Sequence, residues 1–253
     1  MDASATNADE HGAVAFFRDL VAALGSTWDQ QAATPAQQVP AVLSQAWDSF
    51  EGNVAIQSEG QPPIDCSKGC ATCCMLRVSA TAAEIFLIAR FIEATAPAYA
   101  KAGIDLQQRL HEADARTRGL DDAQRVQLRQ RCPFIAQGAC TIYKVRPLAC
   151  RGHASHSRKA CVDAAAGRVN EVPFSGPHRL VRAFVQSALQ AVLRARGLAY
   201  GVYELNQALV LALRDPALAG AWQGGADPLA TAAVDSAEDL VAMGAALDEA
   251  LAA

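Results

Sequence analysis

The residues of this sequence best suited to chemistry are its eight cysteines, four of which lie within nine positions. The stretch DCSKGCATCCMLR, residues 65–77, contains Cys66, Cys70, Cys73 and Cys74. Thiolate is a preferred ligand of zinc and of iron–sulfur clusters, and two cysteines separated by two residues can approach one centre from a tight loop. Cys70 and Cys73 have this spacing, and Gly69 permits a sharp turn before them. The stretch therefore predicts a metal-binding loop.

A second set of cysteines follows after a gap of 57 residues. The predicted metal ligands from both sets are Cys66, Cys70, Cys73, Cys74, Cys132, Cys140 and Cys150. Cys161 lies beyond the compact motif, and its role stays open between a ligand and an ordinary buried cysteine. His153 and His156 could ligate a metal or donate protons, although a surface or core histidine is the commoner outcome.

Seven or eight thiols exceed the four that a single zinc ion or a single cubane cluster needs. Two centres, one multinuclear centre, or one centre with additional redox thiols are all consistent with this number. Adjacent Cβ atoms of an extended segment point in opposite directions, so Cys73 and Cys74 would not easily chelate one ion. They could serve different centres, or one of them could be reactive or only support the ligands.

Charge is unevenly distributed along the chain. Between Cys66 and Arg182, 18 Lys and Arg residues stand against 9 Asp and Glu, whereas the remainder carries 4 against 17. A basic segment can indicate an anionic partner, but these residues are dispersed and lack a run with interleaved aromatics. We interpret them as compensation for thiolate charge. The expected partner is an unspecified protein or redox partner rather than nucleic acid.

The sequence also predicts a compartment. The first twenty residues are acidic and lack the basic and apolar regions of a secretory signal. The longest apolar stretches are far shorter than the roughly 18 to 20 residues that span a bilayer. We therefore expect a cytoplasmic protein with no membrane association, in which cysteines serve as metal ligands or redox groups rather than as disulfides.

A mostly α fold is expected, with a small β-hairpin and irregular cysteine-rich loops that form the metal site. The chain is 51% hydrophobic but only 6% aromatic, and it is rich in alanine. Three regions are predicted: accessory helices over 1–60, a cysteine-cluster metal-binding domain over 61–165, and C-terminal helices over 166–253 that pack on it.

Before the cysteines, residues 13–24 predict one helix, and Pro40 can begin a second that places Leu43, Trp47 and Phe50 on one face. Behind the first cysteine set, Thr81 and Glu84 fit a capping box. This box predicts a helix that begins there and runs to about residue 95, with a stop signal near residue 97. Residues 104–131 are polar and rich in Arg and Gln, and they are expected to form a solvated helix or helical hairpin that serves mainly as a spacer.

Short β-prone runs around residues 137–139 predict a hairpin flanked by Cys132 and Cys140. Tyr143 and Arg146 are expected to support the site rather than to catalyse a reaction.

Three further helices are predicted in the C-terminal part. The first runs from residue 177 to 197, with Arg182 and Gln186 on its polar face, and the others cover about 201–214 and 236–252.

The ordered cysteines, with the runs CPFI at 132–135, CTIY at 140–143 and RPLACR at 146–151, resemble the YkgJ family, also called the CxxCxxCC zinc- or iron-chelating family. The resemblance covers about residues 60–155, and the YELNQAL run at 203–209 extends it. The family name implies two residues in the first gap, whereas three separate Cys66 from Cys70 here. Family members are often labelled iron–sulfur oxidoreductases, and a related domain occurs in flagellin lysine-N-methylase.

Three functions follow as alternatives. An iron–sulfur protein in a redox or metalloenzyme role, which would make the chain an oxidoreductase, is favoured slightly over a zinc protein with a structural or interaction role. A methyltransferase-like, protein-modifying enzyme rests only on the resemblance, since no glycine-rich strand-to-helix loop is present. No Ser-His-Asp, P-loop, HExxH or EF-hand pattern was found, so the sequence names no catalytic residue.

Overall fold

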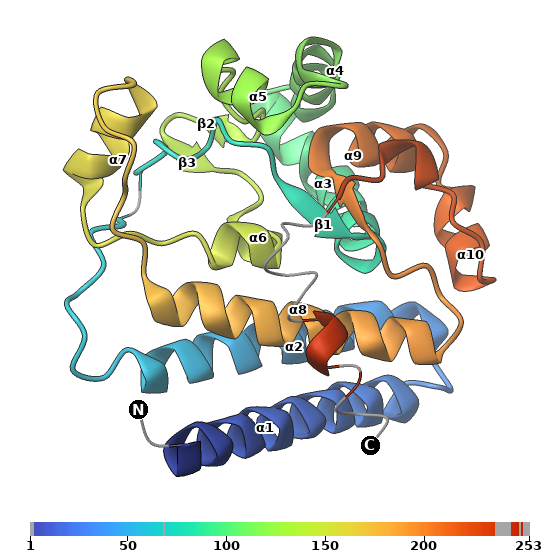
Figure 1. Cartoon of the computed structure of the whole chain (residues 1–253). Coiled ribbons are helices and arrows are strands. Elements are labelled where there is room, and N and C mark those ends of the chain that lie inside the picture. Colours follow the sequence, from blue (N-terminus) through green and yellow to red (C-terminus); the bar gives the residue numbers. More distant parts are fainter. Residues whose placement is uncertain (1–2, 68, 236–243, 248, 250–253) are drawn as a thin grey trace.

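The computed structural model describes residues 3–67, 69–235, 244–247 and 249, and these are mostly helical. One layer consists of three long helices that lie side by side (Figure 1). They are α1 (Ala3–Gln30), α2 (Pro35–Gln57) and α8 (Gly176–Ala195). Their facing sides are apolar, and Leu24, Leu43 and Leu189 are completely buried between them. Burial of this kind is the main source of folding free energy.

The predicted accessory helices are longer than expected. The first extends well beyond residues 13–24, and the second begins at Pro35, so that Pro40 lies inside it rather than at its start. A proline lacks the N–H that would bond to the carbonyl four residues earlier. Here that carbonyl, of Ala36, accepts a hydrogen bond from the Arg90 guanidinium at 3.3 Å. A tertiary contact therefore compensates for the missing helical bond.

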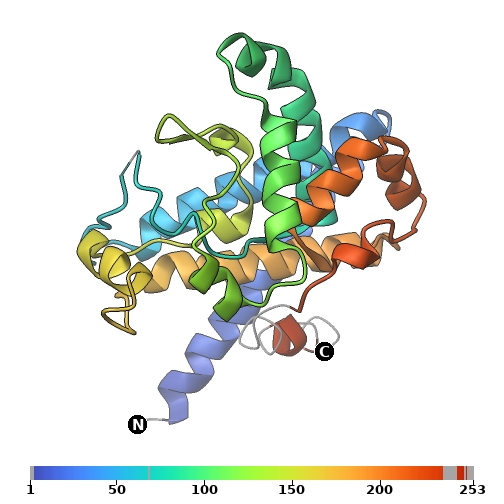
Figure 2. The ribbon, with the colours of Figure 1, turned by 90° about the horizontal axis from the view of Figure 1, so that it is seen from above.

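A second group of helices crosses the first layer (Figure 2). It contains α3 (Ala82–Lys101), α4 (Leu106–Thr117), α5 (Asp122–Leu128), α9 (Leu205–Arg214) and α10 (Ala217–Gln223). The capping box at the start of α3 is confirmed. The predicted stop near residue 97 is wrong, because α3 continues through Pro97 to Lys101.

The region predicted to be a solvated helical spacer is helical and mostly exposed, but one side of α4 belongs to the core. Within it, α4 packs against α9 and buries Leu106, Leu110 and Ala113. The polar composition of the region hid this apolar face, which consists of few residues. The region therefore contributes to packing as well as linking the two cysteine sets.

The described residues form two short antiparallel sheets, one between distant segments and one a local hairpin. Strand β1 (Ser79–Thr81) pairs with β4 (Val202–Glu204), with Ser79 opposite Glu204. The helix predicted over 201–214 therefore begins with a strand, and only Leu205–Arg214 is helical. Strands β2 (Ile135–Ala136) and β3 (Ala139–Cys140) form the predicted hairpin.

The remaining elements are short, and the last of them, residues 230–232, contacts β4. They are α6 (Leu148–Arg151), α7 (Arg158–Ala165) and the 3₁₀ turns η1 (Tyr143–Val145) and η2 (Ala230–Ala232). The helix predicted over 177–197 is confirmed as α8, but Gln186 on its expected polar face is buried. The helix predicted over 236–252 falls mostly outside the described residues; within it, 244–247 and 249 are helical.

Candidate metal centre

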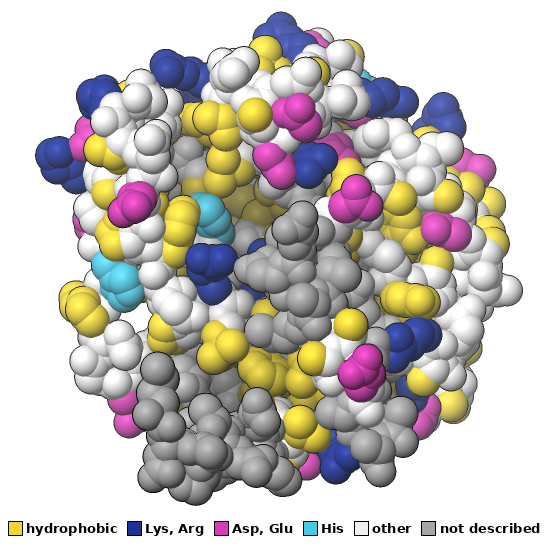
Figure 3. Space-filling model, viewed as in Figure 1, with side chains coloured by type: hydrophobic (Ala, Val, Ile, Leu, Met, Phe, Trp, Pro, Cys, Tyr) yellow, Lys and Arg dark blue, Asp and Glu magenta, His cyan; other side chains and the backbone are white. Residues whose placement is uncertain are grey.

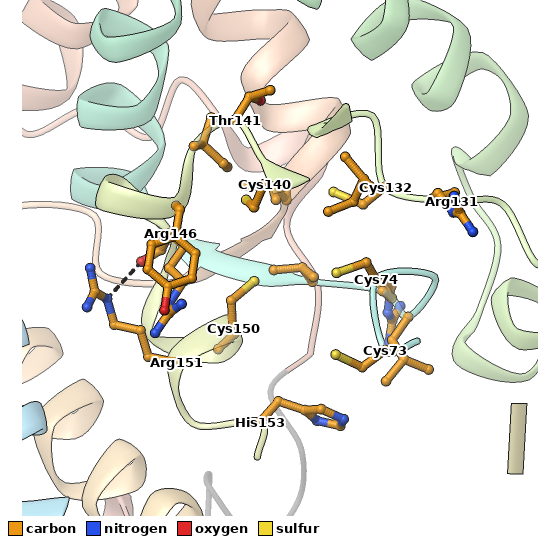
Figure 4. A pocket seen from close by; sticks show the side chains of 18 of the residues that line it. Cys73, Cys74, Arg131, Cys132, Cys140, Thr141, Arg146, Cys150, Arg151 and His153 are labelled. Carbon is orange, nitrogen blue, oxygen red and sulfur yellow. Dashed lines mark hydrogen bonds between the residues drawn. The ribbon is translucent and has the colours of Figure 1, made fainter. Parts of the chain in front are cut away.

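All seven cysteines predicted as metal ligands line one cavity of about 1240 Å³. Five of them, Cys73, Cys74, Cys132, Cys140 and Cys150, surround a common space in Figure 4. They come from three separate segments: the loop before β1, the hairpin region and α6. On the face seen in Figure 3, hydrophobic, histidine and basic side chains border a hollow in the surface.

The first cysteine loop is held by backbone hydrogen bonds and one glycine. The Asp65 N–H donates to the Ser155 carbonyl at 2.9 Å, and the Cys70 N–H donates to the Ser67 carbonyl at 2.9 Å. Gly69 has a backbone φ of +89°, which residues other than glycine rarely adopt. The predicted turn at this glycine is therefore present.

The hairpin brings the second set of cysteines against the first. Its turn residues, Gln137 and Gly138, have φ values of 50° and 77°, which suit a tight two-residue connection. Cys140 lies in β3, and Cys132 precedes β2. The Cys132 N–H donates to the Cys74 carbonyl at 2.6 Å, so a direct backbone contact joins the two sets.

Cys150 is positioned from α3 through Glu84. One Glu84 carboxylate oxygen accepts from the Leu148 N–H at 2.8 Å, at the start of α6. The other accepts from the backbone N–H of Thr81 at 2.9 Å and from its hydroxyl at 3.0 Å. Glu84 is only 2% exposed, and burial raises the pKa of its carboxyl. The capping residue thus also fixes the segment that carries Cys150.

Burial raises the pKa of several of the cavity thiols. It raises the pKa of Cys150 strongly and that of Cys132 to about 12. The pKa of Cys73 is raised by its interaction with the Cys74 side chain and by burial. Desolvation disfavours bare thiolates, so these cysteines need a compensating positive charge to ionise. A bound metal ion supplies such a charge.

Basic side chains supply part of this compensation. Arg146 lies close enough to Cys140 and Cys150 to favour their thiolates. Its guanidinium stacks on the Tyr143 ring at 3.9 Å from the centroid, and its Nε is buried without a hydrogen-bond partner. Arg151 donates to the Arg146 carbonyl at 3.1 Å and holds this turn. These contacts place Arg146 and Tyr143 beside the cysteines.

Sequence reasoning missed a buried ion pair at the cavity wall. Arg125 Nη1 lies 3.2 Å from Glu204 Oε1, and the two side chains are 6% and 8% exposed. Both residues lie near enough to Cys132 to influence its pKa in opposite directions. Glu204 and Asn206 also line the cavity. Their only sequence signal was the run at 203–209.

The sequence left the roles of His153, His156 and Cys161 open, and the structure places these residues in three different surroundings. His153 lines the cavity and packs on Phe174 with ring centroids 4.8 Å apart, and burial lowers its pKa. His156 contacts the Pro63 carbonyl through Nδ1 at 3.2 Å. Cys161 lies in α7 and, unlike the seven predicted ligands, is not among the residues that line the cavity.

The thiols do not enclose a single point. Within the described part of the chain, no three Cys, His, Asp or Glu side chains are placed to hold one metal ion. The donor chemistry nevertheless fits a thiophilic metal, because seven sulfurs and several compensating cations share one cavity. The arrangement defines a cysteine-rich metal site on a helical scaffold.

Comparison with known families agrees with this class. Residues 65–168 match the CxxCxxCC family model, described as a "Putative zinc- or iron-chelating domain". The matched segment contains all eight cysteines and supports metal binding by zinc or iron. Comparisons with curated proteins and with solved structures gave no match. No helix among the described residues is long and apolar enough to cross a membrane.

Proposed function

We propose that this chain is an iron–sulfur protein with a redox or metalloenzyme role, located in the cytoplasm and working with a protein or redox partner. The observation that carries the proposal is the gathering of seven thiols around one cavity. Sulfur-only ligand sets are typical of zinc and of iron–sulfur clusters.

The spread of the thiols supports a cluster over a lone zinc ion. Four thiolates at about 2.3 Å from one tetrahedral zinc lie only about 3.8 Å from each other. In a cluster, iron atoms and bridging sulfides stand between the thiolates, so the thiolates lie farther apart. The described cysteines share a cavity without closing on one point, which suits the wider ligand set.

The surroundings are also suited to a redox centre. A cluster held by four thiolates carries net negative charge, and the charge and hydrogen bonding around it set its potential. Arg146 beside Cys140 and Cys150 contributes positive charge, and the Arg125–Glu204 pair contributes a dipole near Cys132. When bound, the cluster would supply one-electron chemistry, and these residues would hold it and adjust its potential.

Anaerobic purification tests the proposal directly. We expect a brown protein with iron and acid-labile sulfide in comparable amounts and an electron paramagnetic resonance signal after reduction. Cys150→Ser should lose most of the cluster bound at that thiol, whereas the neighbouring Ala149→Ser should keep it. A colourless wild-type protein that contains zinc and no sulfide would replace the proposal with a zinc-binding structural or interaction role.

A further inference from the structure

Three side chains that line the cavity each have a buried polar atom without a hydrogen-bond partner. The described residues contain five such atoms, and three of them belong to the cavity: Arg125 Nε, Thr141 Oγ1 and Arg146 Nε. Buried polar groups in proteins are almost always hydrogen-bonded, so each exception needs an explanation. The two arginine nitrogens are donors, and the hydroxyl can donate as well. The cavity therefore offers hydrogen-bond donors that suit a ligand rich in acceptor oxygens.

The charge of the cavity wall favours the same kind of ligand. Seven basic and three acidic side chains line the cavity. Three of the basic ones are paired with carboxylates: Arg77 with Asp122, Arg125 with Glu204, and Arg151 with Glu51. Arg146 has no such pair among the described residues, and the sequence from 123 to 162 contains no Asp or Glu. An anionic ligand would balance this charge.

The fold fixes Thr141 and Arg146 on one short segment after the hairpin. The Arg146 guanidinium stacks on the Tyr143 ring at 3.9 Å from the centroid, and the Arg146 carbonyl accepts from Arg151 Nε at 3.1 Å. Thr141 is 8% exposed, and its carbonyl accepts from the Tyr99 hydroxyl at 3.1 Å. Because these residues are already ordered, a ligand that binds them pays little for immobilising them.

The cavity is large enough for a ligand beside a metal centre. Its volume of about 1240 Å³ exceeds the roughly 300–1,000 Å³ of typical small-molecule sites. In Figure 4, Thr141 and Arg146 lie to one side of the cysteines, and Arg131 lies to the other. Thr141 directly follows Cys140 in the chain, so a ligand held by Thr141 would lie next to the thiols.

We propose that the cavity binds, beside the metal site, a small molecule with a carboxylate or phosphate group, and that Arg146 and Thr141 hold this group. The guanidinium fork matches two oxygens of either group, and the Thr141 hydroxyl donates a further hydrogen bond. The inference names the class of substrate for the proposed metalloenzyme. It rests on the proposed function only for the role of the ligand as a substrate.

Anion binding to anaerobically purified wild-type protein tests the inference. Inorganic phosphate and succinate are titrated separately by calorimetry, at an ionic strength held constant with chloride. We expect one equivalent of at least one anion to bind, and the tighter of the two identifies the group. Arg146→Gln and Thr141→Val should each weaken this binding about tenfold or more, because each removes a hydrogen bond to a charged group.

Two comparisons make the test specific. Arg131→Gln removes the same charge from the other side of the cysteines, so it is the matched control and should bind the anion as the wild type does. Thr141→Val removes a buried hydroxyl that has no partner in the protein. Its stability in urea and its metal content should therefore not fall below those of the wild type, which separates lost binding from misfolding.

The outcomes separate this inference from the proposed function. It is overturned if neither anion binds the wild type saturably, if Thr141→Val binds as tightly as the wild type, or if Arg146→Gln and Arg131→Gln weaken binding equally. Equal weakening would indicate a general effect of charge. Specific anion binding to a protein without iron would support the inference and remove the iron–sulfur role, whereas an iron–sulfur protein that binds neither anion would do the reverse.

Discussion

Glu84 offers the sharpest test of how the scaffold positions the site. Its carboxylate accepts hydrogen bonds from Leu148 N–H, Thr81 N–H and the Thr81 hydroxyl, and it is 2% exposed. In Glu84→Gln, one amide oxygen remains as an acceptor, and the amide nitrogen faces N–H donors. At least one buried N–H then loses its partner, at a cost of about 1–3 kcal/mol.

Part of this cost is offset, because the variant no longer buries a carboxyl whose pKa is raised by desolvation. A net loss of about 1–2 kcal/mol is expected. For a chain of this size, it corresponds to a fall in Tm of roughly 2–8 °C. Because Leu148 begins the helix that carries Cys150, the variant should also bind metal more weakly.

Urea unfolding of the metal-free protein and a competitive metal-chelator titration measure the two effects separately. Glu93→Gln is the matched control, since Glu93 lies on the same helix with an exposed side chain. The reasoning is refuted if Glu84→Gln unfolds within 0.5 kcal/mol of Glu93→Gln, an interval typical of surface substitutions at about ±0.5 kcal/mol.

Four further outcomes are expected. Arg125→Met should destabilise the protein by about 3–5 kcal/mol in urea unfolding, because it leaves Glu204 as a buried, uncompensated carboxylate; a smaller loss in the double variant Arg125→Met/Glu204→Leu would confirm this cause. Gly152→Ala should lower Tm through a loss of about 1–3 kcal/mol, because its Cβ would lie 2.6 Å from Arg182 Cδ. The pKa of Cys132 is raised from 9.0 to about 12 in the folded, metal-free protein, so the unfolded chain loses this proton at a lower pH than the folded chain. The protein should keep its full stability below pH 9 and become less stable as the pH rises toward 12, which melting curves from pH 7 to 11 would show. Metal removal by a chelator should leave the far-ultraviolet circular dichroism nearly unchanged, since the long helices bury their own apolar core.

Features set by neighbouring residues could be predicted from the sequence. The capping box needs only Thr81 and the residue three positions later, and the hairpin turn needs only a glycine between two short β-prone runs. Gathering of the cysteines was also predicted, because metal ligands must converge whatever the fold. The seven predicted cysteines line one cavity, while their role as ligands stays a prediction.

Features that depend on distant contacts could not be predicted. Pro40 was expected to begin a helix, but the Arg90 contact to Ala36 allows the helix to start earlier. The buried pair of Arg125 and Glu204 joins residues 79 positions apart, and neither has a local signal that distinguishes it from a surface charge. Such pairs are visible only once the two segments are in contact.

The helical scaffold and the cysteine site are held together by different interactions, so the chain does not need a metal ion in order to fold. Zinc fingers fold only when metal binds, because they lack a sufficient core. Here the long helices have their own core. The cysteine segments are held by hydrogen bonds from backbone N–H groups: Asp65 to the Ser155 carbonyl, Cys132 to the Cys74 carbonyl, and Leu148 to the Glu84 carboxylate of α3. These bonds need no metal. Binding free energy can therefore go into deprotonating the buried thiols and drawing them together rather than into folding the chain.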